Sequence, residues 1–435
     1  MKILHYSTDD ITGGAAKAAH RLHRALREAG HDSRMVVRYK KSDDPHVQQT
    51  APPPPRPWAS RFERARQHIP GLRRRELKAS YMFNFDDEPP IDPQSLLIAA
   101  QDEPDGVDII CLHWVTGLLD VKNIRRLYDH YRCPIIWIPP DQEAVTGGCH
   151  YSFGCDGFTK ECGCCPQLDS RNPRDRSHIV RERKRTYLAE VQLCFAAPTG
   201  WVAARIKESS LFKSHRVELI PYAIDPTVFR PFDRTVARDL LQLPFDKKVI
   251  FFGATYLEDR RKGMPLLLDA LHRLAALLDG GGAIQRADVF LLVAGLQGQR
   301  LLDGLPFAGK YVGHLNSDLM LALAYQAADV FVCPSVEEAG PMMIPEAMLC
   351  GLPVVAFDTG GAPDIIKHRQ TGYLAALGDS DDLARGIYAL LTAEAPAAMR
   401  EAARQAGLAA HAPAIVVARH LALYRSLLGA HGQAV

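Results

Sequence analysis

The chain of 435 residues contains two successive series in which short apolar runs alternate with longer helical patterns. Such alternation is typical of strand-helix-strand units, whose strands form a parallel sheet. The first series has expected strands at Ile3–Ser7, Ser33–Val37, Val107–Leu112, Pro134–Ile138 and Leu193–Ala197. The second has expected strands at Val249–Gly253, Val289–Ala294, Val330–Cys333 and Pro353–Phe357. The pattern predicts an α/β protein with two domains, and a length of about 150 residues per domain predicts two or three.

Prolines interrupt regular structure between the two series, because they restrict their own backbone and that of the preceding residue. We therefore expect the hinge between about Pro221 and Pro231. This gives an N-terminal domain over residues 1–220 and a C-terminal domain over 221–410. The remaining residues, 411–435, contain an apolar helical pattern over Pro413–Leu428, which predicts a helix that docks on another surface.

Composition excludes several classes of protein. Hydrophobic residues make up 47% of the chain and charged residues 23%, which is typical of a packed globular protein and not of a disordered or fibrous chain. The formal net charge of +2 gives no overall field that would attract nucleic acid. There is no run of about 18 uninterrupted apolar residues, and the first residues resemble a strand more than a signal peptide. These features predict a cytoplasmic protein that does not bind nucleic acid.

One local segment departs from this neutral composition. The polyproline stretch Ala51–Pro57 is followed by a basic stretch that extends to Lys78. Residues 56–78 contain eight Arg or Lys and two Glu, a local charge of +6, with apolar residues interleaved. This pattern fits a surface that lies against anionic lipid head groups, although a solvated helix face has the same composition. The first interpretation would bring the protein to the inner face of a membrane.

Ligands of open parallel sheets bind beyond the carboxyl ends of the strands, so the loops there are candidate sites. The first loop contains Gly13 and Gly14 at the start of an expected helix, Ala15–Ala29. Glycines at this point let backbone N–H groups approach an anion closely, but they are also ordinary turn residues. A G-x-G-x-x-G pattern is missing here, which argues against a dinucleotide enzyme.

A second loop follows the expected strand that ends at Gly253. It contains the adjacent cations Arg261 and Lys262, and Gly263 then begins a helical pattern. Arg can bind a phosphate with two hydrogen bonds and Lys can bind it as a point charge, so the pair suits a diphosphate. A solvated run of charges is the alternative interpretation.

A third loop, residues 333–348, is the most informative. Glu338 is expected in the loop and Glu346 about one turn into the following helix, so both carboxylates could face one ligand. Carboxylates accept hydrogen bonds from sugar and ribose hydroxyl groups. The backbone N–H groups near the start of that helix could bind the anionic part of the same ligand. The residues concerned are Gly340, Pro341, Met342 and Met343.

With these motifs in place, the run from Pro334 to Gly372 resembles the nucleotide-sugar-binding half of the retaining glycosyltransferases of family four, which have the GT-B fold. The resemblance covers most of the chain. Its other matching motifs are Gly13-Gly14, His113-Trp114, Ile220-Pro221, Ile224-Asp225, Phe229-Arg230-Pro231, Lys262-Gly263 and Val312-Gly313. It implies two Rossmann-like domains that face each other across a cleft, with the C-terminal helix crossing back to the N-terminal domain.

The resemblance also implies a function. The protein would transfer a sugar, with retention, from a nucleotide-diphosphate sugar to a carbohydrate or lipid-linked acceptor in cell-surface polysaccharide assembly. Lys262 would hold the donor diphosphate, Glu338 the sugar hydroxyls and Glu346 the ribose, while Gly13 and Gly14 would approach the phosphates from the opposite wall. Gly253, Arg261 and residues 340–343 would also contact the donor. A catalytic metal is not expected, because Arg261 and Lys262 supply the positive charge. The alternatives are a catalytically silent sugar- or nucleotide-binding protein and a nucleotide-sugar epimerase.

The sequence departs from the family at two strand ends. After Gly253, where the family usually has an arginine, the chain has Ala254-Thr255, and we assign that charge to Arg261. After residues 134–138, where the family tends to have His-Asp, it has Pro139-Pro140-Asp141, and Pro140 has no hydrogen-bonding side chain. Either His113, Asp141 or His150 covers the missing sugar contact, or the activity is altered or lost.

Five of the ten cysteines lie close together in residues 149–165. The spacing of four of them is compatible with a tetrahedral structural zinc site that fixes an irregular loop. These four are Cys149, Cys155, Cys162 and Cys165, which leaves Cys164 spare. A reduced, metal-free loop and a pair of disulfides are the alternatives.

Overall fold

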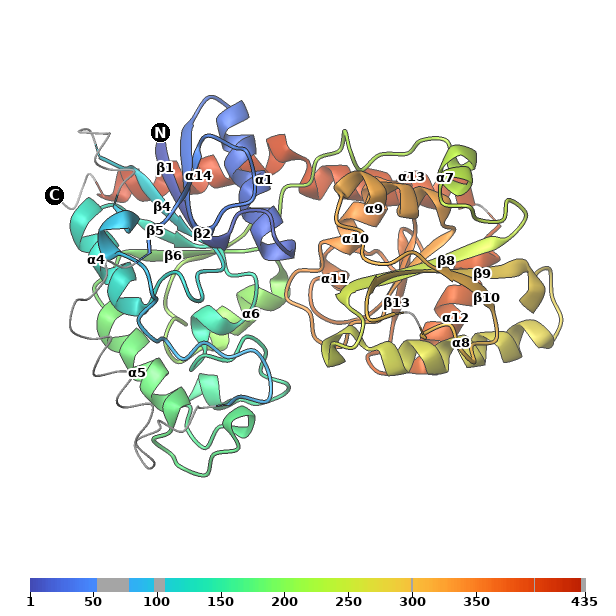
Figure 1. The fold of residues 1–435 in the computed structure, drawn as a ribbon, viewed down its shortest axis with the longest axis horizontal. Coiled ribbons are helices and arrows are strands. Elements are labelled where there is room, and N and C mark those ends of the chain that lie inside the picture. The colour runs from blue at the N-terminus through green and yellow to red at the C-terminus, as the bar shows by residue number, and fades with distance from the viewer. Residues whose placement is uncertain (53–77, 98–105, 299, 395, 432–435) are drawn as a thin grey trace. The chain divides into compact units, whose positions relative to one another are not determined.

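The computed structural model describes residues 1–52, 78–97, 106–298, 300–394 and 396–431 (Figure 1). Its chain divides into two compact units. Unit 1 consists of Met1–Ala196, Ala204–Glu218 and Leu423–Val435, and unit 2 consists of Ala197–Ala203 and Leu219–Ala422. Each unit contains one parallel sheet, so the expected α/β fold with two Rossmann-like domains is confirmed. Most of the basic stretch of residues 56–78 lies outside the described residues, and the lipid-facing surface stays a prediction.

The sheet of unit 1 has the strand order β3-β2-β1-β4-β5-β6-β7. Its strands are β1 (Lys2–Asp9), β2 (Asp32–Tyr39), β3 (Val47–Gln49), β4 (Ile109–Leu112), β5 (Ile135–Trp137), β6 (Leu193–Ala197) and β7 (Val217–Leu219). The helices along this part of the chain are α1 (Gly14–Glu28), α4 (Val121–Tyr131), α5 (Arg176–Leu188) and α6 (Gly200–Glu208). Short 3-10 turns lie between them at η1 (Pro93–Leu96), η2 (Glu143–Val145), η3 (Gly157–Thr159) and η4 (Pro166–Leu168).

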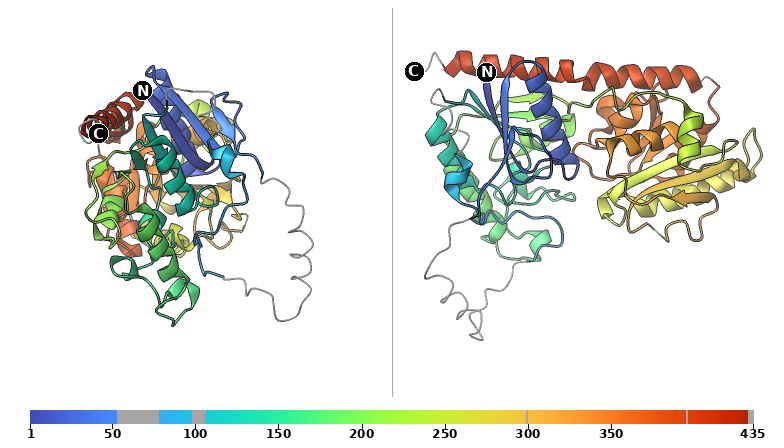
Figure 2. Two further views of the ribbon diagram at one scale, coloured as in Figure 1. Left: turned by 90° about the vertical axis from the view of Figure 1, so that its left-hand side faces the viewer. Right: turned by 45° about the horizontal axis from the view of Figure 1, so that its top comes forward.

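Burial explains why these segments form the central layer of unit 1. All four residues of β4 are buried, as expected for a parallel strand that helices cover on both faces. Helix α1 buries Ala19, Leu22 and Leu26 on one stripe, and it lies against β1 and β2 (Figures 1 and 2). The helix ends before Gly30, whose φ of 83° lies in the left-handed region that glycine adopts readily.

The sheet of unit 2 has the order β10-β9-β8-β11-β12-β13. Its strands are β8 (Lys248–Tyr256), β9 (Val289–Leu296), β10 (Ala308–Tyr311), β11 (Val330–Cys333), β12 (Val354–Phe357) and β13 (Gly372–Ala375). The helices along this part of the chain are α7 (Arg234–Leu240), α8 (Met264–Asp279), α9 (Asp318–Ala327), α10 (Met343–Leu349), α11 (Ala362–Ile365), α12 (Ser380–Leu391), α13 (Pro396–His411) and α14 (Pro413–His431). Two 3-10 turns are η5 (Arg260–Lys262) and η6 (Arg286–Asp288).

Alternate residues of the central strands of unit 2 enter two separate cores. Along β8, Phe251 joins a cluster with residues of α9 and α10, whereas Phe252 joins one with residues of α8 and α12. Figure 1 shows these two helix pairs on opposite sides of the sheet. Because the sheet is covered on both faces, ligands can reach its strands only at their ends. The loops that follow β8 and β11 are therefore the positions that matter for function.

Several boundaries differ from the expected ones. Strand β8 continues three residues past Gly253, with a register irregularity between Gly253 and Tyr256, so the expected strand end was wrong. The boundary between unit 1 and unit 2 lies between residues 218 and 219, whereas the sequence indicated a boundary between residues 220 and 221. Residues 197–203 also belong to unit 2. The last boundary lies inside α14, between Ala422 and Leu423, and not at 410/411.

The C-terminal helices also bear on the expected lack of a membrane span. Within the described residues, one stretch, Pro396–Gly429, is long and apolar enough to cross a membrane by length and composition. It has a mean hydropathy of 1.3. Helix α13 in this stretch packs on α10 and buries Ala403 and Gly407, and α14 buries Tyr424, whose Oη lies 3.3 Å from the Cys111 Sγ. Of its most apolar part, 33% is buried inside the protein.

Candidate functional site

A cluster of charged side chains lies where β8 and β11 of unit 2 end. The Asp259 carboxylate caps η5 by accepting a hydrogen bond of 3.0 Å from the Arg261 N–H. Gly263 ends this turn with a φ of 64°. The tight turn sets Arg261 and Lys262 on successive positions before α8, beside the loop that contains Glu338. We call Asp259, Arg261, Lys262 and Glu338 the donor cluster.

The ion pairs of the donor cluster distinguish its two cations. The Lys262 Nζ donates to the Glu338 Oε2. The Arg261 Nη2 lies 2.7 Å from the Asp259 Oδ2, and its Nη1 lies 3.9 Å from the Glu338 Oε1. The Lys262 side chain is 26% exposed, whereas that of Arg261 is only 10% exposed. Lys262 is therefore the cation that a ligand reaches more easily, and Arg261 is held mainly by Asp259.

The charge state of Glu338 follows from these contacts. Burial alone would raise the pKa of its carboxyl, but Lys262 and Arg261 outweigh burial and hold the pKa below its usual value. An ionised carboxylate can only accept hydrogen bonds. Glu338 is therefore suited to the hydroxyl groups of a ligand, next to a cation suited to an anionic group.

Close backbone contacts fix the two loops of the donor cluster. A Cβ atom on Gly263 would lie 1.9 Å from the Pro334 carbonyl oxygen, and one on Gly360 would lie 1.9 Å from the Glu338 carbonyl oxygen. The Val336 N–H donates to the Arg261 carbonyl at 2.8 Å. Both glycines also have positive φ, so other residues would be strained there. The positions of Arg261 and Glu338 are thus set by backbone packing as well as by charge.

Glu346 lies in the first turn of α10, as the sequence indicated, and it is buried. The Tyr325 Oη donates to its Oε2 at 3.4 Å. Glu346 is therefore held by a side chain of α9, the helix that packs beside α10.

The other expected donor residues of unit 2 lie around the same strand ends. A Cβ atom on Gly253 would lie 3.5 Å from the Met343 Cε, and one on Gly340 would lie 3.0 Å from the Tyr222 ring. Pro341 lies beside Gly361, where a Cβ atom would be 3.1 Å from the proline Cδ. Met342 is the partly buried residue that precedes α10. Their expected contacts with a donor stay predictions.

The structure adds two residues to the expected set, Asp259 and Tyr325. Asp259 anchors Arg261, and an Asp two residues before the N–H group that it accepts from is the sequence signal of a capping side chain. Tyr325 is completely buried in α9, far from any motif in the sequence. Its proximity to Glu346 follows only from the packing of α9 on α10.

The expected residues of unit 1 fall into two places. Gly13 is the N-cap of α1 with a φ of 85°, and Gly14 is its first residue. Both are exposed, and a Cβ atom on Gly13 would have no heavy atom within 4 Å. The backbone conformation at Gly13 therefore favours glycine, although there would be space for a side chain.

The second place in unit 1 is the buried region after β4 and β5. The His113 Nε2 lies 2.9 Å from the His5 Nδ1, and the His150 Nδ1 lies 2.7 Å from the Asp141 Oδ2. Burial would lower the pKa of His150, but Asp141 outweighs burial and raises it. All four side chains are buried, and Pro140 is half-buried. Asp141 and His150 act as one pair, and the expected sugar contact of His113, Asp141 or His150 stays a prediction.

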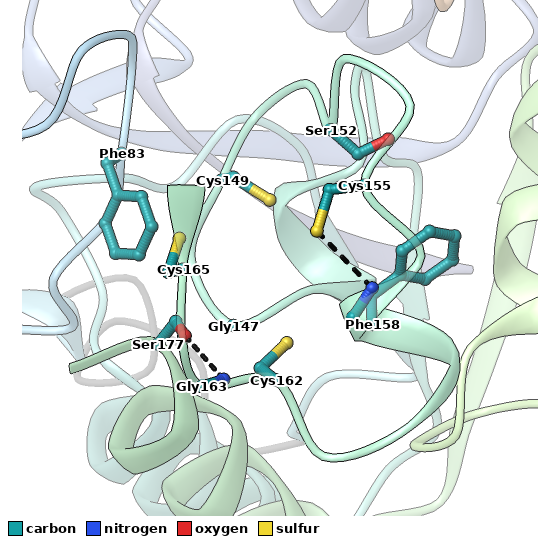
Figure 3. Close-up of a pocket in the computed structure, with 11 residues that line it drawn as sticks. Phe83, Gly147, Cys149, Ser152, Cys155, Phe158, Cys162, Gly163, Cys165 and Ser177 are labelled. Carbon is teal, nitrogen blue, oxygen red and sulfur yellow. Dashed lines mark hydrogen bonds between the residues drawn. The ribbon is translucent and has the colours of Figure 1, made fainter. Parts of the chain in front are cut away.

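The four cysteines of the expected zinc site line one pocket in unit 1 (Figure 3). Cys164 is exposed, and its thiol donates to the Arg171 carbonyl at 3.3 Å. All ten cysteines of the chain are free thiols. As the side chains of the described residues stand, no group of three or more His, Cys, Asp or Glu forms a ready set of metal ligands.

The donor cluster falls in the part of the chain that matches a known family. The model of the family described as "Glycosyl transferases group 1" matches residues 246–393. This segment contains β8, η5, β11 and α10, and hence all four residues of the donor cluster as well as Glu346.

Curated relatives match part of the chain. A D-inositol 3-phosphate glycosyltransferase of Mycolicibacterium paratuberculosis is 35% identical over 210 residues, 45% of this chain and 43% of that protein. A phosphatidyl-myo-inositol mannosyltransferase of Mycobacterium leprae is 34% identical over 151 residues, 33% of this chain and 37% of that protein. The chain thus spans less than half the length of these relatives.

Solved structures match nearly the whole chain. The sucrose-phosphate synthase of Thermosynechococcus elongatus has a TM-score of 0.69 and 20% identity, with 99% of each chain covered. HepE of Anabaena in complex with UDP and glucose has a TM-score of 0.65 and 16% identity, with 98% of this chain and 100% of that chain covered. These likenesses show a shared fold, the two-domain GT-B fold, which confirms the expected fold class.

Proposed function

We propose that the protein is a retaining glycosyltransferase, which transfers a sugar from a nucleotide-diphosphate sugar to a carbohydrate or lipid-linked acceptor. The observation that carries this proposal is the contact of Lys262 and Arg261 with Glu338 at the strand ends of unit 2. The match of residues 246–393 to a glycosyltransferase family and the names of the curated relatives support the same class of reaction.

The chemistry of the donor cluster suits this donor. Lys262 would bind the diphosphate and stabilise its negative charge as the bond to the sugar breaks. Glu338 would accept hydrogen bonds from the sugar hydroxyls, and Glu346 from the ribose. Because Lys262 and Glu338 already contact each other, a donor must bridge the two side chains or part them. In a retaining transfer the acceptor attacks the same face of the sugar from which the phosphate departs. The protein then contributes mainly positioning and charge stabilisation.

The setting of the reaction is also a proposal. A role in cell-surface polysaccharide assembly, in the cytoplasm at the inner face of the membrane, rests on the sequence resemblance and on the basic composition of residues 56–78. Sedimentation with liposomes tests the membrane part. We expect recovery with anionic vesicles and little with neutral vesicles, and equal recovery with both would contradict it.

The main experiment has two steps on the purified full chain. A thermal-shift screen over nucleoside diphosphates and their sugars identifies the donor, since a ligand that binds the folded state raises its apparent stability. Release of the nucleoside diphosphate is then measured with and without candidate acceptors. We expect a shift with one base and faster release with an acceptor. If no nucleotide stabilises the protein, the proposal is wrong.

A second candidate is a sugar- or nucleotide-binding protein without turnover. Pro140 stands where a histidine is expected, and His113 is buried against His5, which favours this alternative. A thermal shift without any turnover of the bound nucleotide sugar would support it. An epimerase would convert the donor sugar in the absence of an acceptor, so analysis of the recovered donor separates that third function from transfer.

A further inference from the structure

The cysteine-lined pocket of unit 1 has no part in the proposed transfer reaction. Its four cysteines come from separate stretches of one irregular segment. Cys149 forms an isolated antiparallel β-bridge with Phe83 through its backbone. Cys155 precedes η3, Cys162 follows it, and Cys165 is the N-cap residue of η4. Figure 3 shows their sulfur atoms arranged around the pocket, with Cys164 not among the lining residues. Within residues 146–168 the structure has only 3-10 turns as regular elements, so this segment lacks the hydrogen-bond ladders that stabilise helices and sheets.

We propose that Cys149, Cys155, Cys162 and Cys165 bind one zinc ion through their four Sγ atoms, and that this ion holds the segment of residues 146–168 in place. Zinc in structural sites is tetrahedral and is commonly bound by four cysteines. The role is structural, because four protein ligands leave no open position for a substrate. The proposal is independent of the proposed glycosyl transfer.

The donor atoms around the pocket favour this metal. Apart from the thiols, the polar side chains that line the pocket are Ser152 and Ser177. The Ser177 Oγ already accepts from the Gly163 N–H at 2.9 Å and donates to the Asp175 Oδ1 at 2.6 Å. The available ligands are therefore soft sulfur atoms, which select zinc or iron over the hard cations magnesium and calcium.

A backbone N–H group points at one of the four sulfur atoms. The Gly157 N–H donates to the Cys155 Sγ at 3.4 Å. Hydrogen bonds to sulfur stabilise the negative charge that a thiolate ligand keeps on a metal. A loop that only buried neutral thiols would gain little from this arrangement.

Glycines make room for the sulfur atoms. A Cβ atom on Gly147 would lie 2.9 Å from the Cys162 Sγ, and one on Gly157 would lie 3.4 Å from the Cys155 Sγ. Three consecutive residues, Cys162, Gly163 and Cys164, have φ of 55°, 91° and 45°. For the two cysteines this left-handed conformation is strained. A bound ion would compensate for this strain, because it fixes the segment at four points.

Binding requires the four sulfur atoms, which already face the pocket in Figure 3, to move closer together, because in the described residues they do not yet form a ready set of ligands. Each thiol loses its proton, so one zinc ion and four thiols give a tetrathiolate site with a charge of −2 and four released protons. No oxidant is involved, whereas two disulfides from the same four thiols would need one. The ion would also fix His150, the neighbour of Cys149, against Asp141.

The experiment measures metal in the full chain, purified without added metal. We expect about one zinc per chain by inductively coupled plasma mass spectrometry. Cys162→Ser and Cys149→Ser should lose most of it. Cys164→Ser is the matched control, because Cys164 lies in the same loop but outside the pocket, and it should keep its zinc.

A second measurement keeps the proposal testable if the variants fail to fold. Exchange of the wild-type metal for cobalt(II) should give the sulfur-to-cobalt charge-transfer and visible bands of a tetrahedral thiolate site. The proposal is wrong if the wild-type chain contains no zinc, if it contains iron in its place, or if its intact mass shows disulfides among these cysteines. Loss of zinc in Cys164→Ser as complete as in Cys162→Ser would also contradict the assignment.

Discussion

At the scale of single residues, Lys262 is the side chain on which donor binding should depend most. Its ammonium group is the more exposed of the two cations beside Glu338. A hydrogen bond between charged groups contributes about 1.5–3 kcal/mol, so Lys262→Ala should weaken binding of the nucleoside diphosphate about 10- to 100-fold. Isothermal titration calorimetry with the nucleotide identified in the thermal-shift screen measures this loss.

Arg260→Ala is the matched control for Lys262→Ala. Arg260 lies in the same 3-10 turn, and its side chain is exposed, whereas that of Lys262 donates to Glu338. We expect the Arg260 variant to bind the nucleotide almost as well as the wild type. If both variants lose affinity equally, the effect comes from the general charge of the turn, and the specific role of Lys262 is wrong.

The pair of His150 and Asp141 gives a prediction about pH. Asp141 raises the pKa of His150 above its ordinary value, against the effect of burial. The pair therefore contributes stability that is fully present below about pH 6.5, the unfolded value, and is lost as the pH rises through the folded pKa. Asp141→Asn should lower the pKa of His150, because the negative charge that counteracts the effect of burial is then removed. An NMR titration of labelled histidine measures this shift.

The control for the His150 titration is Asp156→Asn. Asp156 lies in the same irregular segment, but its side chain is 72% exposed and pairs with Lys160. Its neutralisation should leave the His150 resonance unchanged. A His150 pKa that stays the same in Asp141→Asn would show that the contact between the two side chains does not set the charge of the histidine.

The sequence predicted the cations and carboxylates of the donor cluster but not how they pair. Arg261, Lys262 and Glu338 could be found because they stand in loops after strands, where a parallel sheet gathers its ligand contacts. The sequence could not show that Asp259 forms an ion pair with Arg261, since this depends on the geometry of a 3-10 turn. The contact between Tyr325 and Glu346 could not be predicted from the sequence either, because it joins two helices through tertiary packing.

At the scale of elements, a buried ion pair holds η2 against α5. The Lys184 Nζ lies 2.8 Å from the Glu143 Oε1, with side chains 1% and 6% exposed. It also donates to the Thr146 carbonyl at 3.2 Å. Removal of one partner leaves a buried charge without compensation, which costs about 3–5 kcal/mol. Lys184→Met should therefore lower the free energy of unfolding by this amount, measured by urea denaturation.

Two comparisons test the Lys184 prediction. The double variant Lys184→Met with Glu143→Gln should recover part of the lost stability, because it removes the uncompensated charge. Lys160→Met is the exposed control, since Lys160 and Asp156 are 71% and 72% exposed, and it should change stability little. A single Lys184 variant as stable as the wild type would contradict the role of the pair.

The strands that the sequence did not predict are those at the sheet edges. The edge strands are β3 and β7 in the first sheet and β10 and β13 in the second. The interior strands are covered on both faces, and their continuous apolar runs are easy to recognise. The edge strands are only three or four residues long, and β3 and β10 contain polar residues such as Gln48 and Lys310. Their pairing is therefore decided by the neighbouring strand and not by their own pattern.

At the scale of the whole molecule, the chain crosses between the two units more often than its proline pattern indicates. Residues 197–203 belong to unit 2 although both their flanks belong to unit 1, and α14 is shared between the units. Both crossings fall in segments whose local pattern is ordinary helix or loop. A local pattern shows where a helix forms, but it does not show which core the helix joins.

Unit 2 should lose stability in mild acid because of two buried histidines near its C-terminal boundary. Burial lowers the pKa of His420 to about 3 and that of His411 to about 4. Between these values and about 6.5, the unfolded chain binds protons that the folded chain excludes. Stability is therefore fully present above about pH 6.5 and falls as the pH decreases, by about 2 kcal/mol for each histidine at pH 5. This direction is opposite to that for His150.

Urea unfolding between pH 7.5 and pH 5 measures this loss. His420→Leu replaces a neutral, completely buried ring by an apolar side chain, so it should reduce the dependence on pH by about half while unit 2 stays folded at pH 7.5. Carboxylates with lowered pKa, such as Glu338, add their own loss only at lower pH, because their ordinary values lie near 4.5. A variant with the same slope as the wild type from pH 6.5 to 5 would show that other groups take up the protons.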